Sequence, residues 1–252
     1  MERKIWEIDF DVIGPITIEK NISFRQEKGF DHHQFYSNIQ LSKSHYGIKA
    51  TITAYADTID IAETVAYVYF GRMRDILTLN NEVPIQLHKN EGRYNSPRSF
   101  PGRRVLTETN IKTAFKMSRI FESEQSKLLR AIGWYSKGKL SHNTFDQFLA
   151  FWNVIEILGK KYHTPINRTK EGVKNQIYQC FIDYFGEITS WDLPERWIDS
   201  MYDKRNGIVH GGENTTLEAI KETSKVIPLL DKTSKMLIDK IIDNIYDRSV
   251  FI

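Results

Sequence analysis

The sequence predicts an α+β N-terminal domain followed by an all-α, up-and-down helical bundle. Two patterns support this division. Up to about residue 105, short stretches alternate between apolar and polar residues, which is typical of strands. Beyond it, apolar residues recur at the three- and four-residue steps of amphipathic helices. A chain of 252 residues is long enough for two small domains, so we expect one at 1–105 and a second at 106–252.

The first domain is expected to contain several short strands. Residues 5–12 and 46–55 alternate between apolar and polar side chains, as half-buried strands do. Further short strands are expected at 16–18 and 35–41. The apolar faces of the two alternating stretches consist of Trp6, Ile8, Phe10 and Val12, and of Ile48, Ala50, Ile52 and Ala54.

One amphipathic helix is expected to complete this domain. Asp57 is a plausible N-cap for it. Apolar residues then recur at helical spacing, namely Ile59, Ala62, Ala66, Tyr69, Met73 and Ile76.

Residues 81–105 are expected to form a basic linker, and two interpretations of it stay open. The stretch contains three of the seven prolines, which is typical of a solvated interdomain segment. Its basic residues are interleaved with Tyr94 and Phe100, as a loop that contacts RNA requires. In the second interpretation the RNA-binding residues are Arg93, Arg98, Arg103 and Arg104.

The second domain is expected to contain five helices. An apolar stripe at 111–132 predicts the first, with Gly133 and Gly138 near its end. The others are expected near 141–159, at 173–185, from Pro194 onward, and at 217–246, where Pro228 predicts a kink. Short connections between these helices favour an up-and-down bundle.

The segment "DKRNGIVHGG" at 203–212 combines groups suited to cleaving RNA without a metal. Arg205 offers a permanent charge and a planar set of donors, which suits a phosphate. His210 can accept or give a proton near neutral pH. Asn206 adds a neutral donor and acceptor that can orient either group.

The spacing of these residues sets two conditions on such a site. Five positions of a continuous helix turn Arg205 well away from His210, so we expect a bend or a cap near Gly207 or Gly211 and Gly212. One histidine also has to serve two proton transfers. A symmetric dimer would supply a second copy and divide the acid and base roles.

The segment "RNGIVHG" has the Arg-Asn-x-x-x-His form of the motif of HEPN domains, and the chain resembles this family of small helical bundles. Upstream, "FDQFLAFWNVIEILGK" is similar to the aromatic-rich, glutamate-containing helix of the ApeA-like branch. The resemblance covers roughly 107–250, more than half of the chain. Many HEPN proteins are metal-independent endoribonucleases of toxin–antitoxin, abortive-infection and CRISPR-linked antiviral defence systems.

This resemblance implies a HEPN-like fold, an RNA substrate, no cofactor and a homodimer formed through the C-terminal bundle. It makes Arg205 and His210 catalytic and Asn206 the polar residue of the motif. The N-terminal domain would sense an infection cue or restrain the nuclease, so an antitoxin or an infection-derived trigger is a further expected partner. The alternative is a non-catalytic HEPN-fold module that binds a nucleotide ligand or a partner protein.

Glu156 lies in the middle of the predicted aromatic helix, and two roles stay open for it. Its carboxylate can pair with Arg205 or Asn206 and hold the site in shape. Otherwise it faces solvent at the edge of the apolar stripe.

Other patterns exclude several function classes. The chain has no Cys-x-x-Cys, no phosphate-binding glycine loop and no Gly-x-Ser-x-Gly, which argues against an ATPase, a Rossmann enzyme or a serine hydrolase. Adjacent His32 and His33 are poorly placed to chelate a metal, so no metal is expected. The single Cys180, the absence of an apolar stretch of membrane-spanning length and the charged N-terminus predict a cytoplasmic protein without membrane association.

Overall fold

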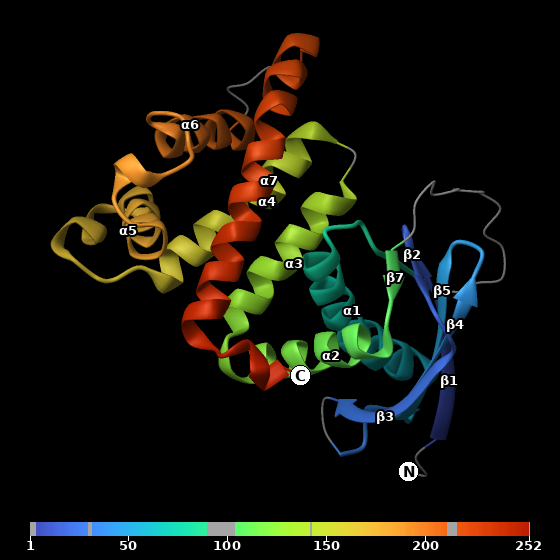
Figure 1. The fold of residues 1–252 in the computed structure, drawn as a ribbon. Helices are drawn as coiled ribbons and strands as arrows, with labels where there is room; N and C mark the ends of the chain where they lie inside the picture. The colour runs from blue at the N-terminus through green and yellow to red at the C-terminus, as the bar shows by residue number, and fades with distance from the viewer. Residues whose placement is uncertain (1–3, 30–31, 90–103, 142, 211–215, 252) are drawn as a thin grey trace. The chain divides into compact units, whose positions relative to one another are not determined.

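The computed structural model describes residues 4–29, 32–89, 104–141, 143–210 and 216–251 (Figure 1). The chain divides into two compact units, Met1–Arg119 and Ile120–Ile252. The first combines an antiparallel sheet with helical structure and the second is helical, so the predicted order of an α+β part and a helical part is confirmed. The division falls inside α2 (Glu108–Glu124).

Five strands of the first unit form one antiparallel sheet in the order β3-β4-β5-β1-β6. Two short strands, β2 and β7, pair in parallel as a second sheet. The strands are β1 (Lys4–Ile13), β2 (Ile16–Ile18), β3 (Ile22–Gly29), β4 (Phe35–Ser44), β5 (Gly47–Ala56), β6 (Gln86–Lys89) and β7 (Arg104–Leu106).

The two alternating stretches pair directly with each other. In the register of β1 and β5, Phe10 lies opposite Ala50, and the pairs that flank it on the same face, two residues away in each direction, consist of isoleucine and valine only. These side chains are at most 4% exposed, so the apolar faces expected from the sequence meet in the core. The four flanking partners are Ile8, Ile52, Val12 and Ile48.

Helix α1 (Ile59–Asn81) contacts the five strands of the larger sheet. Its N-cap is Thr58, whose hydroxyl accepts a hydrogen bond from the backbone N–H of Ile61 at 3.4 Å. The prediction of Asp57 as the cap is therefore wrong by one position. Threonine, like aspartate, can accept a hydrogen bond from a backbone N–H of the first turn that has no partner within the helix.

Residues 81–105 are not wholly a linker, and this part of the prediction is corrected. Gln86–Lys89 extends the main sheet as β6, and Arg104–Leu106 pairs with β2. Strand β3 was also missed, because five of its eight residues are polar and it lies at the sheet edge, where little of its surface is buried. Residues 90–103 lie outside the described residues.

The second unit consists of helices joined by short connections (Figure 1). Helix α4 is central within it, because it contacts α3, α5, α6 and α7. Its apolar face contains Trp152, Phe148, Phe151 and Leu158, all fully buried. The helices are α3 (Ser126–Leu140), α4 (Thr144–Tyr162), α5 (Val173–Phe185), α6 (Trp197–Val209) and α7 (Leu217–Ile245), with 3-10 turns η1 (Asn167–Glu171), η2 (Ile188–Ser190) and η3 (Arg248–Phe251).

The predicted helix bounds hold for α5 and for α7, which contains Pro228. The single stripe at 111–132 is instead split into α2 and α3, because Gln125 has a non-helical backbone at φ −134° and ψ 52°. Helix α4 begins at Thr144 after Asn143, whose side chain accepts from two backbone N–H groups. Helix α6 begins at Trp197, and Pro194 lies in the preceding turn.

Cys180 is fully buried, as expected of a structural thiol. Burial raises the pKa of its thiol to about 12, and nearby Asp183 acts in the same direction. A thiol held in the protonated form is not a nucleophile. Among the described residues, no helix combines the length and the apolar character needed to cross a membrane.

Candidate functional site

Arg205 and Asn206 lie in the last two turns of α6. The Nη1 of Arg205 donates a hydrogen bond to the Oδ1 of Asn206 at 3.1 Å. The arginine side chain is 26% exposed. No other hydrogen bond of this guanidinium involves a described residue, so its Nη2 donors can still bind an acceptor from solution.

Glu156 connects α4 to this arginine. Its Oε2 lies 3.6 Å from the Nε of Arg205, and its Oε1 accepts from the Nζ of Lys160 at 2.7 Å. The Glu156 side chain is only 14% exposed, and Oε2 has no hydrogen bond to a described residue. The charge of this half-buried carboxylate is therefore balanced by two cations. Of the two roles considered for Glu156, the structure shows the pairing with Arg205.

His210 is the C-cap of α6 and is exposed. Its backbone N–H donates to the carbonyl of Asn206 at 3.0 Å, with φ −94° and ψ 8°. The helix is continuous through Gly207, so the bend considered at that glycine is absent and the helix ends at Val209. Gly211 and Gly212 lie outside the described residues.

This end of α6 does not bring the arginine and the histidine into contact within one chain. No hydrogen bond or ion pair joins the two side chains. Five residues of a helix of 3.6 residues per turn correspond to a rotation of about 140°, so Arg205 and His210 leave the axis in different directions. The arginine makes an ion pair with Glu156 and a hydrogen bond to Asn206, whereas His210 is exposed.

A basic cavity of about 420 Å³ lies between α3 and α4 and has Glu156 in its wall. Sequence reasoning missed it. Its signal is the helical spacing of Lys127, Arg130 and Trp134, which places three side chains on one face of α3. The lining residues are Lys127, Arg130, Trp134, Asn153, Glu156, Ile157, Lys160 and Lys161.

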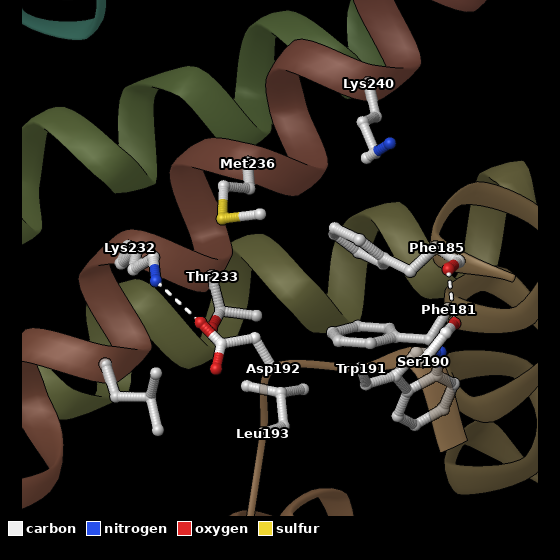
Figure 2. Close-up of a pocket in the computed structure, with 11 residues that line it drawn as sticks. Phe181, Phe185, Ser190, Trp191, Asp192, Leu193, Lys232, Thr233, Met236 and Lys240 are labelled. Carbon is white, nitrogen blue, oxygen red and sulfur yellow. Dashed lines mark hydrogen bonds and ion pairs between the residues drawn. The ribbon is translucent and has the colours of Figure 1, made fainter. Parts of the chain in front are cut away.

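A second cavity of about 230 Å³ lies between α7 and the segment from α5 to Leu193 (Figure 2). Its wall has three aromatic residues, Phe181, Phe185 and Trp191, on one side, and Met236 of α7 projects toward it. Lys232 of α7 forms an ion pair with Asp192 across it at 3.0 Å. Neither Arg205 nor His210 lines this cavity, so it is separate from the motif.

Of the four arginines of the basic linker that were expected to contact RNA, one lies in the described part of the chain. Arg93, Arg98 and Arg103 lie outside the described residues. Arg104 is exposed at the start of β7, and its backbone N–H donates to the carbonyl of Pro15 at 2.6 Å. His32 and His33 precede β4 in a loop, and in the described part of the chain no group of three or more His, Cys, Asp or Glu side chains is arranged to hold a metal ion.

The fold and site together define a class: an α+β unit followed by a helical unit in which a partly buried carboxylate pairs with an arginine, and an exposed histidine caps the helix that carries this arginine. Compared with models of known families, with curated proteins and with solved structures, the chain has no match. The site offers a guanidinium with unused donors, an exposed histidine and a neighbouring basic cavity.

Proposed function

We propose that the protein is a HEPN-type, metal-independent endoribonuclease, with a role in prokaryotic antiviral defence, abortive infection or a toxin–antitoxin system. The observation that carries the proposal is the anchoring of Arg205 of the Arg-Asn-x-x-x-His motif by Glu156, at 3.6 Å, on the neighbouring helix. A fixed guanidinium with unused donors suits a phosphate whose charge grows during the reaction.

The proposed reaction is an in-line attack of a ribose 2′-oxygen on the adjacent phosphorus. The 2′-oxygen–phosphorus bond forms, the bond from phosphorus to the 5′-oxygen breaks, and the 2′-hydroxyl proton passes to a base. An acid then protonates the leaving 5′-oxygen, which gives a 2′,3′-cyclic phosphate and a 5′-hydroxyl. Arg205 stabilises the phosphorane and His210 transfers protons.

A homodimer completes this site. Within one chain the guanidinium is held by Glu156, while His210 is exposed at the end of α6. A twofold axis near the end of α6 would place two copies of His210 and two of Arg205 around one phosphate. One imidazole then acts as base and the other as acid. Removal of either His210 copy should therefore stop the reaction.

The test is RNA cleavage in EDTA by the wild type, His210→Ala and Val209→Ala. Val209 precedes the histidine and is 48% exposed, so its truncation controls for local disturbance of the helix end. We expect cleavage by the wild type and Val209→Ala and none by His210→Ala. Cleavage that EDTA abolishes, or that His210→Ala retains at the wild-type rate, would contradict the proposal.

One observation favours the alternative, a non-catalytic binding module. Glu156 already matches the charge of Arg205, and paired arginines at helix ends also serve structural roles. In that case no RNA is cut, and the wild type, His210→Ala and Val209→Ala bind the same partner equally well.

A further inference from the structure

The cavity between α3 and α4 is lined by cationic side chains that belong neither to the motif nor to the Arg205–Glu156 pair. Four exposed cationic side chains surround it, and one carboxylate, Glu156, lies in its wall. Three of the four cations make no ion pair with any described residue, whereas Lys160 is paired with Glu156 at 2.7 Å. The three are Lys127, Arg130 and Lys161.

An indole lies among these charges. Trp134 is half-buried in the cavity wall, seven residues after Lys127 and four after Arg130 on α3. The Nζ of Lys137 lies over one face of its ring, 4.7 Å from the centroid, so a flat ligand would stack on the other face. The volume of about 420 Å³ falls in the range of roughly 300–1,000 Å³ typical of small-molecule pockets.

We infer that this cavity binds a single-stranded nucleic acid, with phosphates on Lys127, Arg130 and Lys161 and one base on Trp134. Single strands are typically held by such a combination of a cationic groove and an aromatic platform. A duplex keeps its base faces stacked inside, so it could use the cations but not the indole. That the natural ligand is RNA rests on the proposed function. That the cavity binds a single strand does not depend on the proposed function.

Glu156 links this cavity to the motif. Its carboxylate lines the cavity and also lies 3.6 Å from Arg205. A strand that lies in the cavity therefore has a phosphate-binding arginine one side chain away. In this arrangement the cavity holds the strand beside the bond that is to be cut, and its residues are positioning residues for the substrate.

The test measures binding separately from cleavage. The full chain carrying His210→Ala is titrated into fluorescently labelled single-stranded RNA, and anisotropy is read at several salt concentrations. The same measurement is made with single-stranded DNA of the same sequence, with an RNA duplex and with poly-L-glutamate. The variants are Lys127→Glu combined with Arg130→Glu, Trp134→Ala and Trp134→Phe.

The matched control for the charge reversal is Lys43→Glu combined with Lys170→Glu. Both lysines are exposed, neither lines the cavity, and the pair changes net charge by the same amount. Since Lys127 and Arg130 are exposed and unpaired among the described residues, their reversal should leave folding intact. Circular dichroism of each variant verifies this.

We expect both single strands to bind and the duplex to bind more weakly. A plot of log K against log salt has a negative slope, and the Lys127/Arg130 reversal should make this slope less steep by about 1.4. This change corresponds to two lost phosphate contacts on a single strand. Trp134→Ala should weaken binding by about 5- to 150-fold, whereas Trp134→Phe, which keeps a ring, should retain most of the affinity. The control pair should bind as the wild type does.

Three outcomes would overturn the inference. These are unchanged strand binding by the charge reversal, equal binding of the duplex, or loss of poly-L-glutamate binding in the variants while RNA binding is kept. The last outcome would assign the cavity to an acidic protein. If the strand binds through the cavity and the wild type leaves RNA uncut, the proposed function fails and the inference stands. If the cavity variants cut and bind RNA as the wild type does, the inference about the cavity fails and the proposed function stands.

Discussion

The Nε of Arg205 lies 3.6 Å from the Oε2 of Glu156, so the arginine of the motif on α6 is tied to the central helix α4. The two residues are 49 positions apart in the sequence, and their pairing depends on the packing of the two helices. The carboxylate is also bonded to Lys160, 2.7 Å away on its own helix. The proposed positioning role of Glu156 can therefore be tested without altering the motif.

Glu156→Gln should lower the rate of RNA cleavage by roughly 10- to 100-fold, the range typical for the loss of a residue that orients a site group. The amide keeps the shape but removes the charge that holds the guanidinium. Single-turnover rates with saturating protein measure the effect. Glu171→Gln, at an exposed position outside the site, is the control and should cut normally. Full activity of Glu156→Gln alongside an inactive Arg205→Ala would show that the pair is not needed.

Arg205→Lys should be nearly as inactive as Arg205→Ala, with a loss of roughly 10²–10³-fold in the chemical step. Lysine keeps the charge but lacks the planar set of donors, which bonds Asn206 and, in the proposed site, also a phosphate. Cleavage rates and thermal unfolding midpoints of both variants separate a catalytic effect from a loss of folding. If Arg205→Lys retains wild-type activity, only the charge matters.

Two glycines in helices should respond in opposite directions to alanine. A Cβ at Gly159 of α4 would lie 2.7 Å from Cγ1 and 3.0 Å from Cα of Ile177 on α5. Gly159→Ala should therefore destabilise the fold by about 1–3 kcal/mol through overpacking. Gly71 of α1 has open space around a Cβ, and its replacement should stabilise the helix by about 0.5–1 kcal/mol. Denaturant unfolding measures both, and equal signs for the two variants would contradict the packing of α4 on α5.

The buried Cys180 predicts a loss of stability in alkali. Its pKa is raised to about 12 in the folded state, so the unfolded chain ionises first and the folded state becomes less favourable as pH rises above about 9. Between pH 8 and pH 10 this thiol should cost the wild type roughly 1–2 kcal/mol of unfolding free energy. Urea unfolding of the wild type and of Cys180→Ala at both pH values isolates this effect, because Cys180→Ala lacks it. An identical pH dependence of the two proteins would be inconsistent with the raised pKa.

The parts of the fold that follow a strong period were predictable from the sequence. Strands β1 and β5 alternate strictly, and α5 ends at Gly186 as expected. Elements with a weak period were missed, namely the polar edge strand β3 and the short strands β6 and β7, whose existence depends on partners far away in the chain. The break between α2 and α3 at Gln125 was also missed. The apolar stripe at 111–132 continues across it, so the break is evident only from the backbone angles.

The candidate site was predictable only in part. The residue types of Arg205, Asn206 and His210 stand together in the sequence, but the partner of the arginine comes from another helix. The spacing in the sequence left a bend at Gly207 open, whereas the structure has an unbroken helix there. The cavity lined by Trp134 requires α3 and α4 side by side, which single-helix periodicity cannot specify.

The account depends most directly on attack by a ribose 2′-oxygen at a site built from Arg205 and His210. The decisive measurement compares, in EDTA, one RNA strand with the same strand carrying 2′-O-methyl groups, and analyses the product ends. The account predicts that the wild type cuts only the unmodified strand and leaves 2′,3′-cyclic phosphate and 5′-hydroxyl ends, while His210→Ala cuts neither. Cleavage of the methylated strand, or products with 5′-phosphate ends, would contradict it.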